Sequence, residues 1–375
     1  MKFKPIYPLF ILLFLFTLVS NDSVAQTKPQ VQLAILLDTS NSMDGLIDQA
    51  KSQLWKIVNE LALTKRNGQS IDFHVGLYEY GKSSIAAEEG HLRQICALTT
   101  DLDKISEELF ALTTNGGDEY CGQVIGAAVR GLKWSEDNDD LKIIFIAGNE
   151  PFTQGKVDYK TSCKEAIGRS IIVNTIFCGN YQEGIDTFWK DGADLADGKY
   201  INIDQNQQIV RIDAPQDSEI VVLGQQLNET YIAYGSVGKE YKERQNAQDM
   251  NAMALSPQVM AQRSVAKASA HYKNQQWDLV DAEKTGAVSV ESLDEEALPE
   301  EMKEMDKQER KAYLEDMSQK RRKIQKHINR LNKERRQFIA DQLKNSSENT
   351  LDTAMLNMIR EQAKEKNYTF EDQSQ

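Results

Sequence analysis

Short apolar runs alternate with amphipathic stretches between Val31 and about Ile203. The runs at 31–37 (VQLAILL), 141–148 (LKIIFIAG) and 170–179 (SIIVNTIFCG) are almost continuously apolar, which is typical of strands buried on both faces. Apolar residues at helical spacing separate these runs. The alternation predicts an α/β domain with a doubly wound, mainly parallel sheet. In such folds, ligands lie at the carboxyl ends of the strands.

The pattern changes after about residue 235. Strand signals end there, and Ala, Gln, Glu, Lys and Arg dominate. Segment 299–343 has the pattern of one helix, which would span about 65 Å at 1.5 Å per residue. It must therefore project or fold back, and 350–367 is a suitable partner. The pattern predicts an all-α, coiled-coil-like extension over 236–375.

One apolar seam runs along the long predicted helix at a seven-residue repeat. Arg321 and Arg335 interrupt this seam. Its apolar members are Leu314, Met317, Ile324, Ile328, Leu331 and Phe338.

The first 25 residues have the pattern of a signal peptide. Two lysines precede an apolar stretch rich in Phe and Leu, and Ser23-Val24-Ala25 forms a small-residue cleavage site. An uncleaved membrane anchor is the alternative, because the apolar run approaches spanning length. No later stretch is long and apolar enough to span a membrane. We expect an exported protein, periplasmic or extracellular, with a signal peptide at 1–25, an α/β domain at 26–235 and a helical extension at 236–375.

Charge and cysteine content refine this picture. The formal net charge of -13 favours solubility and argues against non-specific binding to nucleic acid. Export makes disulfides chemically feasible, and four cysteines allow three pairings. Because each pair would hold a loop near the ligand edge, we expect Cys96–Cys121 and Cys163–Cys178, with free buried thiols as the alternative.

The stretch at 36–45 (LLDTSNSMDG) carries the clearest candidate chemistry. It follows the first apolar run and places Asp38, Ser40 and Ser42 on alternate residues. A carboxylate and two hydroxyls suit a partly hydrated, hard cation such as Mg²⁺. The same residues are also common helix caps, here for a helix at 44–62. The spacing alone is compatible with both interpretations.

With this motif in this place, residues 31–235 resemble the von Willebrand factor A domain family, in its bacterial secreted type. The family's metal-ion-dependent adhesion site carries D-x-S-x-S after the first strand. The resemblance implies that the two serines bind Mg²⁺, or Mn²⁺ or Ca²⁺, and that the Asp binds it directly or through water.

Two further loops depart from the family pattern. Gly116-Gly117-Asp118 stands where many members have Gly-Gly-Thr, and Asn149 stands where the family usually has Asp. A scaffold that has lost the metal is the alternative. The metal ligands implied by the resemblance are Asp38, Ser40, Ser42, Asp118, Glu119 and Asn149.

The resemblance implies a secreted, metal-dependent binding or adhesion module that recognises an acidic side chain of a protein partner. The chain has no G-x-S-x-G, H-E-x-x-H or Walker motif, so we expect no enzyme. A metal-dependent hydrolase using Asp38, Asp118 and Glu119 lacks an identifiable general base. The alternative function is an assembly protein, in which the helical extension makes the main contact or self-associates. The basic run at 320–336 is either a solvated helix face or a docking surface for an acidic partner.

Overall fold

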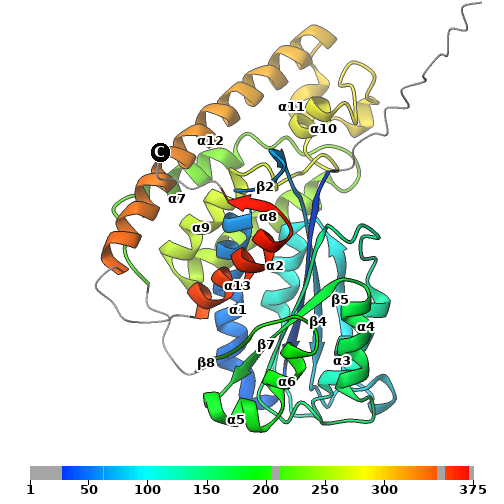
Figure 1. The fold of residues 1–375 in the computed structure, drawn as a ribbon. Coiled ribbons are helices and arrows are strands. Elements are labelled where there is room, and N and C mark those ends of the chain that lie inside the picture. The colour runs from blue at the N-terminus through cyan, green and yellow to red at the C-terminus, as the bar shows by residue number, and fades with distance from the viewer. Residues whose placement is uncertain (1–27, 62, 204–210, 344–350, 371–375) are drawn as a thin grey trace, which may run out of the picture.

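The computed structural model describes residues 28–61, 63–203, 211–343 and 351–370 (Figure 1). The expected signal peptide at 1–25 lies outside these residues. Across the described ranges, no helix combines the length and the apolar character needed to cross a bilayer.

A six-stranded sheet forms the centre of the molecule, in the order β5-β4-β1-β6-β7-β8. All neighbouring strands are parallel except β4 and β5, which are antiparallel. The doubly wound, mainly parallel sheet predicted from the sequence is therefore confirmed. The strands are β1 (Gln30–Asp38), β4 (Asp72–Tyr80), β5 (Leu92–Thr99), β6 (Leu141–Gly148), β7 (Ile171–Cys178) and β8 (Tyr200–Ile203).

Helices cover both faces of this sheet, which explains why its central strands are apolar without interruption. Successive residues of β1 alternate between two apolar clusters: Leu33 belongs to one and Ala34 to the other. We call these clusters core A and core B. Core A contains α1 (Asp44–Leu61) and α2 (Leu102–Ala111), and core B contains α3 (Cys121–Gly131) and α4 (Tyr159–Gly168).

The remaining elements extend this arrangement. A small sheet of order β3-β2-β9 includes a strand near the C-terminus, although the sequence pattern predicted no strand after residue 235. Its strands are β2 (Thr64–Arg66), β3 (Gln69–Ser70) and β9 (Tyr368–Phe370). Short 3₁₀ helices are η1 (Asn41–Met43), η2 (Ala87–Glu89) and η3 (Glu295–Ala297). The other helices are α5 (Tyr181–Asp186), α6 (Trp189–Asp194), α7 (Asp217–Asn228), α8 (Gly238–Leu255), α9 (Pro257–Lys267), α10 (Leu279–Thr285), α11 (Glu300–Lys303), α12 (Lys307–Leu343) and α13 (Leu351–Glu365).

The long helix begins later than the sequence pattern predicted, at Lys307 rather than about 299. The Asp306 carboxylate accepts hydrogen bonds from the backbone of Gln308 and Glu309, and the Glu309 side chain accepts one from the backbone N–H of Asp306. This reciprocal capping box satisfies donors that are otherwise unpaired at a helix start. It separates α12 from the single turn α11.

Helix α12 packs along α7, α9 and α10, and its two seam arginines are buried contacts rather than interruptions. Arg321 donates to Asp278 at 2.6 Å, to Asp281 at 2.9 Å and to the Thr230 hydroxyl at 3.0 Å. Arg335 pairs with Asp217 at the start of α7. The helix therefore lies against the rest of the molecule instead of projecting from it (Figure 1).

A second buried ion cluster joins the helical extension to the α/β domain. Arg263 of α9 is fully buried and bonds Asp103 of α2 at 2.7 Å and Asp249 of α8 at 2.5 Å. Its guanidinium lies 4.7 Å from the ring centroid of Trp55 in α1. Core A accordingly contains residues from both sides of position 235. The domain division at that position stays a prediction.

Helix α13 packs mainly on α1 and on β9 of the small sheet, and not on α12 as the sequence suggested. Gln362 exchanges two side-chain hydrogen bonds with Asn174 of β7, at 2.7 and 3.0 Å. Arg360 donates to Glu60 of α1 at 2.6 Å. Residues 351–370 thus complete the α/β domain itself, which the heptad-like pattern did not indicate.

The predicted disulfides are wrong: all four cysteines are free and buried. Cys96 and Cys178 lie in core A, whereas Cys121 and Cys163 lie in core B. Each predicted pair would have to bridge through the sheet. A disulfide requires Cα atoms no more than about 7 Å apart with Cβ atoms facing each other.

The two neighbouring arginines of α12 provide a matched test of the buried contacts. Arg321→Ala should lower the free energy of unfolding by about 3–5 kcal/mol, because it leaves the buried Asp278 carboxylate without its cation. Arg322→Ala, which removes an exposed pair with Glu315, should change it by less than about 1 kcal/mol. Denaturant unfolding measures both, and equal losses would contradict the assigned packing.

The thiols should be slow to react in the folded protein. Burial raises the pKa of Cys96 to about 11 and of Cys163 to about 12, and thiolate is the reactive form. Alkylation at pH 8 without reductant, read by intact mass, should add few labels to the native protein and four after unfolding. Two labels or none after unfolding would indicate a disulfide.

Candidate functional site

The carboxyl ends of three adjacent parallel strands bring the candidate ligands to one edge of the sheet. Leu37 of β1 lies beside Glu79 of β4 and Ala147 of β6, so Asp38, the last residue of β1, and Asn149, the first residue after β6, lie at neighbouring strand ends. In Figure 1 this edge lies at the bottom, near α5, and α12 crosses the opposite end of the molecule.

The loop after β1 holds its polar side chains close together. The backbone N–H of Ser40 donates to Asp38 Oδ1 at 2.7 Å, and the hydroxyls of Ser40 and Ser42 lie 3.4 Å apart. The Asn149 amide donates to Ser42 Oγ at 3.1 Å. Ser40 makes no side-chain capping bond to the following helix η1, so the structure does not use this serine as a cap.

A second loop is tied to the first by its backbone. The Asn115 N–H donates to the carbonyl of Thr39 at 2.9 Å, and the Ser83 N–H donates to the carbonyl of Gly116 at 2.6 Å. This loop carries Glu119, just before α3, to the buried side of the site, where 2 % of the residue is exposed.

Glu119 and Asp38 face each other as carboxyl groups. Burial raises the pKa of Asp38 well above its ordinary value, and the neighbouring Glu119 carboxyl raises it further. Burial also raises the pKa of Glu119. Ionising both of two buried carboxyls in contact is unfavourable, so the pair needs either a bound cation or a proton shared between them.

Gly81 makes this approach sterically feasible. Its φ is +78°, and a Cβ atom there would lie 2.7 Å from Asp38 Oδ1 and 2.8 Å from Glu119 Cγ. Only glycine combines that backbone conformation with the missing atom. Gly81 is not among the site residues predicted from the sequence, although a glycine directly after a buried strand (LYEYG) is the signal that points to it.

Three buried side-chain oxygens at this site accept no hydrogen bond from a protein donor when both carboxyls are ionised. They are Asp38 Oδ2, Glu119 Oε2 and Asn149 Oδ1, each from a different loop. Buried polar atoms are nearly always paired, and carboxylate and amide oxygens are ligands of hard divalent cations. The described ranges contain no group of three or more His, Cys, Asp or Glu residues that could hold a metal ion. This site has only two carboxyls, and two hydroxyls and an amide complete it. The residues present therefore fit a hydrated divalent cation.

Asp118 is the predicted ligand that the structure does not bring to this group. Its side chain is exposed and accepts a hydrogen bond from the Tyr120 hydroxyl at 2.9 Å. Gln154, which is not among the residues predicted from the sequence, instead positions the neighbouring loops. It accepts from the backbone N–H of Glu119 at 3.2 Å and donates to Glu150 at 3.0 Å.

No protein-family model matches the chain, and no curated protein matches it. Among solved structures, it is similar to the conserved hypothetical protein BatB from Bacteroides thetaiotaomicron, with 16% identity and a TM-score of 0.35 over 46% of this chain and 90% of that one. It is also similar to the SpRpn10 VWA domain, with 18% identity and a TM-score of 0.36 over 48% and 90%. A third is proximal thread matrix protein 1 from the mussel byssus with a zinc-occupied MIDAS motif, with 12% identity and a TM-score of 0.35 over 48% and 43%.

The paired carboxyls predict an unusual effect on stability. In EDTA, Asp38→Asn should raise the free energy of unfolding by about 1–2 kcal/mol, because the new amide donates a hydrogen bond to Glu119 in place of a second carboxyl. Asp118→Asn in the same loop region should change it by less than about 0.5 kcal/mol. Chemical denaturation in EDTA measures both values, and a clear loss of stability in Asp38→Asn would argue against the facing carboxyls.

Proposed function

We propose that this chain is a binding module of the von Willebrand factor A type, in which one divalent cation recognises a carboxylate of a protein partner. The observation that carries the proposal is that Asp38, Glu119 and Asn149 each keep one buried side-chain oxygen without a protein donor at this end of the sheet. The D-x-S-x-S loop adds the hydroxyls of Ser40 and Ser42 beside them.

This ligand set suits Mg²⁺, with Mn²⁺ and Ca²⁺ as alternatives. It has five oxygen-bearing side chains, and hard cations of this kind retain positions for water or an incoming oxygen. When bound, the cation supplies an open position for a carboxylate oxygen of the partner. Because Asn149 stands in place of an acidic residue, the formal charge of the ligand set is minus two, from Asp38 and Glu119. This charge balances a divalent cation and leaves no excess negative charge to repel the carboxylate of the partner.

The protein's own residues orient this site. Gly81 lets the carboxyls of Asp38 and Glu119 approach, and the Asn149 amide fixes the Ser42 hydroxyl. Gln154 links the Glu119 backbone to the loop after β6. We propose binding without turnover, since the sequence carries no recognisable catalytic motif.

Cation binding is tested directly on the purified full chain. After EDTA treatment and dialysis, addition of Mg²⁺, Mn²⁺ or Ca²⁺ should raise the free energy of unfolding by about 2.7 kcal/mol at one hundred times the dissociation constant. Asp38→Asn and Glu119→Gln should abolish this rise, and Asp118→Asn should retain it. Elemental analysis should find about one cation per chain.

Two results would contradict the proposal. One is that the chain binds no divalent cation supplied at millimolar concentration. The other is that cation binding survives both Asp38→Asn and Glu119→Gln. Partner recognition has its own criterion. A protein partner held through the cation is released by EDTA and fails to bind Asp38→Asn. A partner that survives both treatments contacts another surface, as the assembly hypothesis requires.

A further inference from the structure

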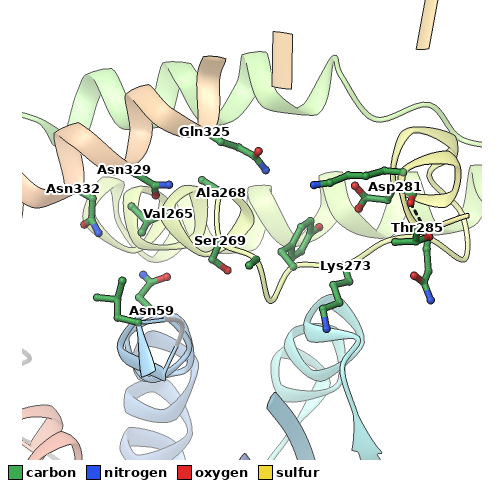
Figure 2. A pocket seen from close by; sticks show the side chains of 15 residues that line it. Asn59, Val265, Ala268, Ser269, Lys273, Asp281, Thr285, Gln325, Asn329 and Asn332 are labelled. Atoms are coloured by element: carbon green, nitrogen blue, oxygen red, sulfur yellow. Dashed lines mark hydrogen bonds between the residues drawn. The ribbon is translucent and has the colours of Figure 1, made fainter. Parts of the chain in front are cut away.

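A cleft of about 610 Å³ with a mixed polar and apolar lining lies between the C-terminal end of α1, the end of α9, α10 and α12. Figure 2 shows Asn59 pointing from α1 toward α12, with Asn329 and Asn332 on the other side. Asn59 follows Asp44 by 15 residues of helix, about 22 Å, so the cleft is separate from the candidate metal site. We call it the α1–α12 cleft.

Carboxamides dominate its polar surface. Gln325, Asn329 and Asn332 recur at i, i+4 and i+7 on one face of α12. Their side chains make no hydrogen bond within the described part of the chain. Opposite them, Asn59 donates to the Gln262 carbonyl at 2.9 Å, but its buried Oδ1 has no partner. The half-buried to exposed carboxamides of α12 therefore keep donors and acceptors that a ligand can reach.

The charged residues of the cleft are mostly neutralised by the protein. Lys273 pairs with Asp72 at 2.6 Å, and Asp281 accepts from Arg321 at 2.9 Å. Lys284 is exposed and forms no ion pair with any described residue. Among the described residues that line the cleft, Lys284 therefore supplies the one ammonium without an ion pair, at the α10 end.

We propose that the α1–α12 cleft binds an extended peptide segment of a partner protein, with an acidic side chain at the Lys284 end. A primary carboxamide presents a donor and an acceptor in one plane, which complements the N–H and C=O of a peptide backbone. Successive carboxamides of α12 lie about 6 and 4.5 Å apart along the helix axis. Those steps are comparable with one to two residues of an extended chain at about 3.3 Å each.

A glycan fits this surface less well than a peptide. Tyr272 is the aromatic residue among those that line the cleft, and it is buried, with its hydroxyl bonded to Asp103. No open ring face is available there for a sugar to stack on. The carboxamides can bond the backbone of a peptide, and Lys284 can pair with one acidic side chain. An extended acidic peptide uses both kinds of contact.

The test uses the full chain on an array of immobilised decapeptides that vary Asp, Glu, Lys and neutral residues at each position. Peptides with one acidic residue among neutral ones should bind. The double variant Asn329→Ala/Asn332→Ala should bind them about tenfold or more weakly, because it removes several neutral hydrogen bonds. Lys284→Glu should shift the preference from acidic to basic peptides.

Two controls distinguish specific binding in the cleft from non-specific binding and from misfolding of the variant. Gln337→Ala removes an exposed α12 carboxamide that bonds Asp341 outside the cleft, and it should leave binding unchanged. The unfolding midpoint of the double variant should match that of the wild type, because both asparagines are unpaired. N-methylation of the central backbone amides of a bound peptide should abolish its binding.

Three outcomes would overturn the proposal. They are equal binding by the double variant, equal binding of N-methylated peptides, and binding to an oligosaccharide array with none to peptides. The test in EDTA should give the same result as in Mg²⁺, so its outcome is independent of the cation site.

Discussion

The parallel pairing of β1 with β4 and β6 is the constraint on which the rest of the molecule depends. Because the three strands run in one direction, the loops after β1 and β6 begin at the same edge. Hydrogen bonds from Asn115 and Ser83 then bring the loop before α3 to that edge. A shift of one residue in either register would turn the side chain of Asp38 to the other face of the sheet and its apolar neighbours out of their clusters.

Burying the helical extension against this domain required charged groups to enter the interior. Arg263 and Arg321 are each surrounded by carboxylates and carbonyls, which offset the cost of removing a guanidinium from water. Arginine suits this role because its planar fork bonds several acceptors at once. Such fixed geometry gives the extension one defined position on the domain, whereas apolar contacts alone would permit sliding.

Much of the architecture was readable from apolar periodicity, and the failures have identifiable causes. Continuous apolar runs predicted the parallel strands because they depend only on burial of both faces. Arg321 and Arg335 looked like breaks in the α12 seam, since their partners Asp278 and Asp217 are remote in sequence. At the site, D-x-S-x-S is local and could be recognised, but the inward turn of Glu119 rather than Asp118 depends on Gln154 and Gly81 in other loops. The cysteines were misassigned because spacing does not reveal on which face of the sheet a side chain lies.

The position of α13 has a consequence for how the chain reaches its native state. Arg360 and Glu60 are 300 residues apart, and Tyr368 bonds the carbonyl of Gln30 across 338 residues. A chain that emerges from its N-terminus must therefore hold α1 and one face of the sheet without this cover until the final helix arrives. Contacts of such long range slow folding, and the uncovered apolar face would make assistance by a chaperone valuable during that interval.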